Sequence, residues 1–404
     1  MISGMALRVA VVHDYLTQRG GAERVALALW RAFPGARLLT SVYEAEATFR
    51  GFAEAEVETS WLQRVPAIRR DPRRALPLLP GAFARMLVQD VDVVVASSSG
   101  FAHGVVTTAP KVVYCHNPAR WLYQPQDYLD RQGPVVRTGL RVLRPRLTAW
   151  DQQAARSADR YLANSSVVRE RVRERYGVDA KVLAPPVTID ADGPQVASPG
   201  VEPGYFLAIG RARGYKNIEA VCQAFAAMPD LRLVVVGGLP SGVWPANVRG
   251  VVGVDDARLR WLYAHSQALV SVAREDFGLT PVEANAFGTP ALVLRAGGFL
   301  DSTVEGETGW FIEGEEPDDV VRAVRRLLAE PLDPVAVRAH AARYAPEVFA
   351  AAVRHEVDEL LARGVVKIGS AGRTGAAAAA GRPRPGRWRT PGRPPPGRTA
   401  GAAP

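Results

Sequence analysis

Two glutamates eight positions apart, Glu275 and Glu283, form the strongest chemical signal in the sequence. Residues 274–290 read REDFGLTPVEANAFGTP, so the first glutamate ends a loop and the second lies in a helix whose first turn contains Pro281. The two carboxylates can therefore face one ligand from two sides. Either glutamate alone would be an ordinary helix cap or surface carboxylate, whereas the pair in this setting indicates a binding site.

The loop between these glutamates also offers backbone donors. The N–H groups around Phe277, Gly278 and Leu279 lie near the start of the predicted helix, where unpaired donors and the helix dipole favour sugar hydroxyls or phosphate oxygens. Glycine at 278 permits a close approach of the ligand to the backbone.

A basic loop follows the strand predicted at 205–209. Arg211 offers a planar fork to two phosphate oxygens, and Lys216 adds a mobile point charge. Together they can hold a diphosphate and stabilise the charge that builds on a leaving group, without a metal ion. An isolated basic loop is more often a solvated surface, but the position at a strand end favours the phosphate role.

The first part of the chain carries a second set of candidates. Gly20 and Gly21 follow the first predicted strand and open a helix, so backbone N–H groups there can approach an anion. His116 follows the strand predicted at 111–114, and Pro118 turns the chain after it. We therefore expect the imidazole to project into a cleft, where it can donate to a hydroxyl or position reacting groups.

These candidates require parallel strands that end at a common edge. Short β-branched runs at 7–12, 91–96 and 111–114 show little alternation, which is typical of strands covered by helices on both faces. The same pattern restarts at residue 205. The further expected strands are 205–209, 231–236, 268–272 and 290–294; the expected helices are 22–32, 148–157, 166–176, 217–227, 257–265, 281–286, 318–329 and 346–361.

The alternation predicts an α/β protein with two Rossmann-like, doubly wound domains that face each other across a cleft. We place the boundaries as follows: a first domain at 1–190, a linker at 191–203, a second domain at 204–345, a closing helix at 346–365, and a disordered Arg/Pro/Gly-rich tail at 366–404.

Charge and composition exclude several classes. The net charge is +9, but residues 370–404 hold seven arginines and no acid, which leaves about +2 for the rest. We therefore expect no nucleic-acid partner. No signal peptide or spanning run of about 18 apolar residues occurs, and Cys115 and Cys222 fall in different predicted domains, so we expect a cytoplasmic protein. Residues 11–21 lack the Gly-x-Gly-x-x-Gly of a nicotinamide dehydrogenase.

Over residues 7–361 the chain resembles glycosyltransferase family 4. Glu275 and Glu283 match the E-x-F-G-L-x-x-x-E motif of that family, and Arg211 and Lys216 match its Arg and Lys five residues apart. His116 matches its His-x-Pro position. Asp276 stands where many members have glycine.

The resemblance implies the GT-B fold, with the first domain on the acceptor side and the second binding the nucleotide-sugar. It implies a retaining hexosyltransferase with a nucleotide-sugar donor and a glycan or lipid-linked acceptor, in bacterial envelope polysaccharide or glycolipid synthesis. The best match for the donor is GDP-mannose, and no cofactor or metal is required. Glu275 is expected to contact donor-sugar hydroxyls and Glu283 the ribose. The catalytic candidates are His116, Glu275, Arg211 and Lys216; the donor-binding candidates are Gly20, Gly21, Arg211, Lys216, Glu275, Phe277, Gly278, Leu279 and Glu283.

Other readings stay open at this point. A GT-B sugar-nucleotide epimerase or hydrolase would use the same cleft, and a non-catalytic sugar-nucleotide or membrane-surface binding protein would keep the cleft without turnover. Residues 61–87 mix arginines with Trp61 and leucines, a pattern that fits either peripheral contact with an anionic membrane, at the inner face of the cell membrane, or a plain exposed basic surface.

Overall fold

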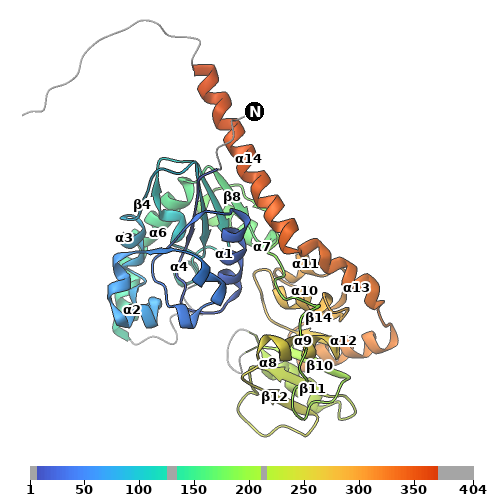
Figure 1. Ribbon diagram of the computed structural model, residues 1–404. Coiled ribbons are helices and arrows are strands. Elements are labelled where there is room, and N and C mark those ends of the chain that lie inside the picture. The colour runs from blue at the N-terminus through green and yellow to red at the C-terminus, as the bar shows by residue number, and fades with distance from the viewer. Residues whose placement is uncertain (1–6, 125–133, 211–215, 372–404) are drawn as a thin grey trace, which may run out of the picture. The chain divides into compact units, whose positions relative to one another are not determined.

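The computed structural model describes residues 7–124, 134–210 and 216–371. Among these residues the strands form two large parallel sheets, one from each half of the chain (Figure 1). We call residues 7–182 the N-terminal half and residues 205–344 the C-terminal half. From residue 372 onward, the tail that we expect to be disordered lies outside the described residues. The predicted fold class, two doubly wound α/β domains, is confirmed.

The N-terminal half is built on a seven-stranded sheet in the order β3-β2-β1-β5-β7-β8-β9, counted over the described residues. Its strands are β1 (Val9–His13), β2 (Arg37–Thr40), β3 (Val57–Thr59), β5 (Val93–Ser98), β7 (Lys111–Cys115), β8 (Arg160–Ala163) and β9 (Lys181–Val182). Every neighbouring pair runs parallel. Strands β4 (Leu87–Val88) and β6 (Val106–Thr107) form a separate parallel pair.

Helices connect these strands. They are α1 (Gly21–Ala32), α2 (Pro66–Arg70), α3 (Leu79–Phe83), α4 (Arg120–Tyr123), α6 (Pro134–Arg156) and α7 (Ser166–Tyr176), with 3₁₀ turns η1 (Ala45–Ala47), η2 (Arg50–Glu54), η3 (Trp61–Arg64), η4 (Pro72–Ala75) and η5 (Ala102–Gly104). Helix α7 shows how local sequence sets such ends. The Ser165 side chain accepts from the Val168 N–H at its start, and Gly177 at φ 67° ends it.

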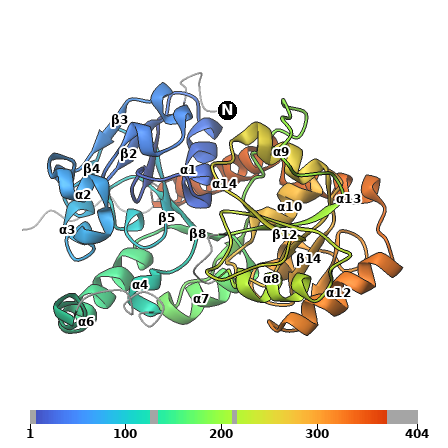
Figure 2. The same ribbon diagram turned by 90° about the horizontal axis from the view of Figure 1, so that it is seen from below.

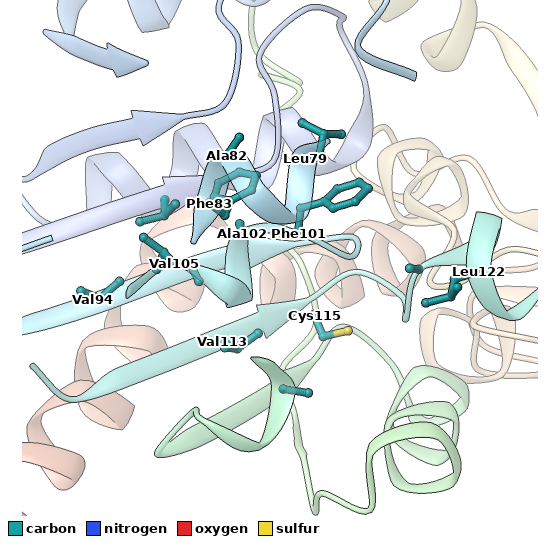
Figure 3. Packing of buried hydrophobic residues seen from close by; sticks show 14 of the residues in the cluster. Leu79, Ala82, Phe83, Val94, Phe101, Ala102, Val105, Val113, Cys115 and Leu122 are labelled. Atoms are coloured by element: carbon teal, nitrogen blue, oxygen red, sulfur yellow. The ribbon is translucent and has the colours of Figure 1, made fainter. Parts of the chain in front are cut away.

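The central strands of this half are buried on both faces because successive side chains point to opposite sides of the sheet. Val9 and Val11 join a cluster with α1, and Ala10 and Val12 join a cluster on the other face. Figure 3 shows the second cluster, in which α3, the β5–η5 segment and β5 and β7 contribute neighbouring side chains. The sheet therefore has two cores, which hold its polar carboxyl edge in place.

The C-terminal half repeats the plan with the strand order β12-β11-β10-β13-β14-β15. Its strands are β10 (Tyr205–Ile209), β11 (Leu233–Val236), β12 (Val248–Val251), β13 (Ser266–Ser271), β14 (Ala291–Leu294) and β15 (Gly309–Ile312). Its helices are α8 (Ile218–Ala226), α9 (Asp256–Ala264), α10 (Leu279–Asn285), α11 (Phe299–Ser302), α12 (Pro317–Ala329) and α13 (Pro334–Ala341), followed by η6 (Ala342–Tyr344). Helices α8 and α12 pack together over one face (Figure 2).

The last helix, α14 (Pro346–Ala371), is long and returns to the N-terminal half (Figure 1). Phe349, Val353 and Val357 are buried in the cluster that contains β1 and α1. Arg354 Nη1 donates to the Ala32 carbonyl at 2.9 Å. None of the described helices, α14 included, combines the length and the apolar composition that crossing a membrane requires.

Candidate functional site

The carboxyl ends of β1, β5 and β7 bring three polar side chains into one buried hydrogen-bond chain. His13 Nδ1 lies 3.2 Å from the Ser97 carbonyl oxygen and 3.0 Å from Ser97 Oγ, and Ser97 Oγ lies 2.8 Å from His116 Nε2. Because a carbonyl oxygen only accepts, the contact with the Ser97 carbonyl places a hydrogen on His13 Nδ1, and Ser97 Oγ is then free to donate to His116 Nε2. In that arrangement a neutral His116 carries its own hydrogen on Nδ1; in the opposite tautomer its Nε2 would donate to Ser97.

The surroundings of His116 keep it neutral. Burial, followed by the charge of His13, lowers the pKa of His116 to about 3. The rings of His13 and Tyr114 contact it edge-on, with centroids 6.2 Å and 5.3 Å away. At neutral pH this imidazole can donate one hydrogen bond to a hydroxyl, but it carries no charge.

Gly20, the N-cap of α1, and Gly21, its first residue, face different neighbours. A Cβ at Gly20 would lie 2.5 Å from Glu23 Oε2, so glycine makes room for this buried carboxylate. Glu23 Oε1 accepts from Gln18 Nε2 at 2.9 Å, and within the described residues Oε2 has no hydrogen-bond partner. A Cβ at Gly21 would lie 3.4 Å from Leu279 Cδ1 in the C-terminal half. The expected approach of an anion to these N–H groups stays a prediction.

Asp14, directly after β1, organises the segment after β5. Its carboxylate accepts three backbone hydrogen bonds, from Ser99 at 2.5 Å, Phe101 at 3.1 Å and Ala102 at 2.7 Å. Burial raises the pKa of Asp14. Sequence reasoning assigned no role to this residue, although an acid at the end of a buried strand was a usable signal.

Lys216 and Glu275 meet at the carboxyl edge of the C-terminal sheet. Lys216 follows β10 and Glu275 follows β13, and these two strands are neighbours. Lys216 Nζ forms an ion pair with Glu275 Oε1, and both side chains are largely buried. The sequence places the two residues 59 positions apart, and the fold brings them together. Arg211, the other predicted phosphate ligand, lies outside the described residues.

The loop at residues 275–278 is shaped by backbone contact with Gly297 and Gly298. The Gly298 N–H donates to the Glu275 carbonyl at 2.9 Å. A Cβ at Gly297, where φ is +63°, would lie 2.5 Å from that same oxygen, and a Cβ at Gly298 would lie 2.3 Å from the Asp276 carbonyl oxygen. Sequence reasoning missed this glycine pair, although two adjacent glycines just after a strand are a recognisable signal.

The predicted backbone donors lie in the turn that begins α10. Gly278 has φ +81°, and a Cβ there would lie 2.3 Å from the Phe299 ring. Phe277 is buried, and Leu279 is half-buried as the first residue of the helix. The helix thus starts two residues before Pro281. Whether these N–H groups bind a sugar stays a prediction.

Glu283 lies on α10 with a partner from each half. Its Oε2 accepts from the Tyr263 hydroxyl at 2.8 Å, and its Oε1 lies 3.7 Å from Arg24 Nη1. Arg24 Nη1 also donates to Thr188 Oγ1 at 3.2 Å. Burial, and then the neighbouring Glu283, raise the pKa of Tyr263, which therefore stays a hydrogen-bond donor. Neither Arg24 nor Tyr263 was among the predicted site residues.

The structure therefore joins some predicted residues and not others. Lys216 contacts Glu275, and Gly21 faces Leu279, whereas the hydrogen-bond partners described for the His116 ring lie in its own half. Asp276, which sequence reasoning noted only as a departure from glycine, pairs with Arg120 and Arg171 of the N-terminal half.

Two family models match the chain. Residues 19–191 match the model described as Glycosyltransferase Family 4, and residues 194–348 match the model described as Glycosyl transferases group 1. The two matches together take in every described strand of both sheets except β1, and they include the glutamate pair.

Curated relatives share part of the chain. The D-inositol 3-phosphate glycosyltransferase of Nocardiopsis dassonvillei is 31% identical over 246 residues, which are 52% of this chain and 56% of the relative. The protein of that name from Mycobacterium tuberculosis is 32% identical over 231 residues, which are 50% of this chain and 48% of the relative. The chain thus spans about half the length of these relatives.

Solved structures share the fold. HepE of Anabaena, in complex with UDP-glucose, aligns with a TM-score of 0.63 and 16% identity over 87% of this chain and 99% of that one. Sucrose-phosphate synthase of Thermosynechococcus elongatus aligns with a TM-score of 0.62 and 18% identity over 88% of this chain and 100% of that one. At these identities the likeness concerns the fold.

Proposed function

This chain belongs to the family 4 glycosyltransferases, and we propose that it transfers a hexose from a nucleotide-sugar to a glycan or lipid-linked acceptor with retention of anomeric configuration. The observation that carries the proposal is the ion pair between Lys216 and Glu275 at the carboxyl edge of the C-terminal sheet. Ligands of open α/β sheets bind at such edges.

Each residue has a role that its chemistry suits. Lys216 supplies a positive charge for the diphosphate, and the carboxylate of Glu275 accepts hydrogen bonds from hydroxyls of the transferred sugar. Glu283, oriented by Tyr263, accepts hydrogen bonds from the ribose. His116 donates from Nδ1 to a sugar hydroxyl, because Ser97 occupies its other nitrogen.

The proposed reaction breaks the bond between the anomeric carbon and the diphosphate, while the acceptor hydroxyl attacks from the same face and gives its proton to the departing diphosphate oxygen. Arg211 and Lys216 stabilise the charge on the departing nucleoside diphosphate. Holding donor and acceptor together makes the step effectively unimolecular. Retention follows from attack on the face that the leaving group vacates.

Two donors compete in this proposal. The motif around His116 favours GDP-mannose, as expected from the family resemblance. A UDP-hexose is the second candidate, because a structure of similar fold, HepE, was solved with UDP-glucose. The curated relatives are named for an inositol phosphate acceptor, which makes a small phosphorylated polyol an acceptor to test.

Peripheral membrane contact also belongs to the proposal. In residues 61–87 Trp61 is 41% exposed and Leu78 is 47% exposed, beside several arginines. Arg69 and Arg74 pair with acids of their own half, which lowers the charge available to a membrane. Co-sedimentation with vesicles containing anionic lipid tests the contact; binding that equals that to neutral vesicles would contradict it.

The first test is calorimetric titration with GDP, UDP and ADP and their sugars, with EDTA present. We expect one diphosphate to bind selectively, and no binding to any would contradict the proposal. Product analysis with and without an acceptor then separates transfer from epimerase or hydrolase chemistry, because only transfer depends on the acceptor.

Substitution of Lys216 tests the leaving-group role. Lys216→Ala should lower kcat about a hundredfold, because it removes charge stabilisation from the transition state. Lys181→Ala is the matched control, since it removes another lysine paired with a glutamate, Glu356, away from the site. An unchanged rate in Lys216→Ala would overturn the assignment.

A further inference from the structure

Asp276 forms a charged junction with the N-terminal half. Its Oδ1 lies 2.6 Å from Arg171 Nη1, and its Oδ2 pairs with Arg120 Nη2. Arg171 lies on α7, and Arg120 begins α4, four residues after His116. The same Arg171 nitrogen lies 3.3 Å from Asn117 Oδ1. One carboxylate of the C-terminal half is therefore held by two guanidinium groups beside the His116 segment.

The backbone of Asp276 is fixed as well. Its carbonyl oxygen accepts from Ser165 Oγ, the N-cap of α7, and a Cβ at Gly298 would lie 2.3 Å from that same oxygen. The next residue adds two more hydrogen bonds between the halves: the Ser166 N–H and Oγ donate to Asp301 Oδ2 at 2.9 Å and 2.8 Å. The start of α7 is thus seated on both the 275–278 loop and α11.

We propose that Asp276 is a positioning residue, which sets the 275–278 loop in its working shape through Arg120 and Arg171. The inference rests on the proposed function, because the loop matters for catalysis only if Glu275 binds the transferred sugar. Asp276 stands between Glu275 and the turn that begins α10. The pairs with Arg120 and Arg171 hold its carboxylate toward the N-terminal half and therefore orient both Glu275 and the turn that begins α10.

The arrangement explains why an acid occupies this position. A glycine could not engage the two arginines, and its backbone would be freer to move. The carboxylate is 17% exposed, and the arginines are 29% and 40% exposed, so the pairs add only modest stability. Their effect is geometric: they link the loop that carries Glu275 to the segment that carries His116.

The test uses Asp276→Asn in the full chain. We expect kcat to fall about tenfold, because the sugar-binding loop loses its alignment with the N-terminal half. The Kd of the nucleoside diphosphate should stay within about twofold, since Lys216 and Glu283 are untouched. A general loosening of the fold would instead lower kcat and weaken binding of the nucleoside diphosphate together. Asp276→Glu, which keeps the charge, should restore most of kcat.

A double-mutant cycle identifies the partner. Arg171→Gln alone should also lower kcat, by up to about tenfold, and the combination with Asp276→Asn should be no worse than Asp276→Asn alone, because that change already breaks the pair with Arg171. Glu315→Gln is the control; it breaks the exposed pair with Arg274, next to Glu275 but within the C-terminal half. A kcat of Asp276→Asn within twofold of the wild type, or losses that simply multiply, would overturn the proposal.

Amide hydrogen exchange gives a readout without turnover. Residues 275–280 should exchange faster in Asp276→Asn than in the wild type or in Glu315→Gln. If no donor supports transfer, the proposed function fails, and this measurement still decides whether Asp276 orders the loop. Equal exchange in all three proteins would overturn the positioning role while leaving the proposed function standing.

Discussion

At the scale of single residues, His116 is oriented by a buried hydrogen-bond chain. Ser97 stands between two histidines and contacts one ring nitrogen of each. Such a chain leaves the other nitrogen of His116, Nδ1, for the ligand in the proposed function. If His116 has that role, its orientation depends on a serine that does not itself need to touch the ligand.

Ser97→Ala tests this orientation. The change leaves His116 Nε2 buried without its hydrogen-bond partner, so we expect a loss of about 1–3 kcal/mol of unfolding free energy and a roughly tenfold lower transfer rate. Ser98→Ala is the control, because Ser98 Oγ contacts the Gly100 N–H and His103 Nδ1 instead. Urea unfolding and steady-state kinetics check both variants; equal rate losses would contradict the role of Ser97.

The low pKa of His116 predicts a pH effect on stability. The unfolded chain protonates this residue near pH 6.5, whereas the folded chain does so only near pH 3. Between these values the unfolded state binds more protons, so this residue's contribution to stability is full above pH 6.5 and is lost as the pH falls.

His116→Asn should therefore lose less stability than the wild type between pH 7 and pH 5, by about 2 kcal/mol. Urea unfolding at the two pH values measures the difference. Parallel losses in both proteins would show that His116 titrates alike in the folded and unfolded chain.

At the scale of elements, close backbone contact shapes the 275–278 loop. Gly297→Ala adds a Cβ 2.5 Å from the Glu275 carbonyl oxygen at a position with φ +63°. Gly253→Ala has a similar φ of +65° but nothing within 4 Å. We expect a loss of about 1 kcal/mol for Gly253→Ala and about 3 kcal/mol or more for Gly297→Ala, measured by urea unfolding. Equal losses would mean that the loop moves aside freely.

The sequence predicts those helices and strands that are buried and regular. The strands β1, β5 and β7 were predicted from short β-branched runs with little alternation, a pattern that arises because helices cover both faces of these strands. The four-residue strands β2, β12 and β15 were missed: two of them contain glycine, and β2 begins with arginine and ends with threonine, whereas β11 and β14, of the same length, are wholly apolar and were predicted. Parallel pairing with β1, β11 and β14 defines the missed strands, and their own four residues do not reveal it.

The candidate site divides in the same way. Residue types at or near strand ends predicted Lys216, Glu275, Glu283 and His116 as site residues, because ligands bind at strand ends in this kind of fold. The residues that contact these side chains in the structure could not be predicted from the sequence. Arg171 and Asp276 are 105 positions apart, and only the packed halves bring them together.

At the scale of the whole molecule, α14 follows the C-terminal half in sequence but packs against the N-terminal half. Phe349 is 3% exposed in the N-terminal core, and its ring centroid lies 5.6 Å from that of Tyr114. Glu356 pairs with Arg160 and Lys181 of the same half. The chain therefore crosses between the halves twice, before β10 and again before α14.

Phe349→Ala should destabilise the N-terminal half by about 3–4 kcal/mol, because it opens a cavity in its core. Val348→Ala is the control, since Val348 is 50% exposed and its loss should cost less than about 0.5 kcal/mol. Exchange protection of β1 and β7 should fall in the first variant only. Unchanged protection there would contradict a shared core.

The return of α14 also bears on how the protein is made. A ribosome delivers the N-terminal half first, yet three side chains of its core, Phe349, Val353 and Val357, emerge after the whole C-terminal half. Domains generally fold in order as they leave the ribosome. Here part of the apolar surface of the first domain stays uncovered until the second has been synthesised, and exposed apolar surface of this kind makes a partly folded chain prone to aggregation.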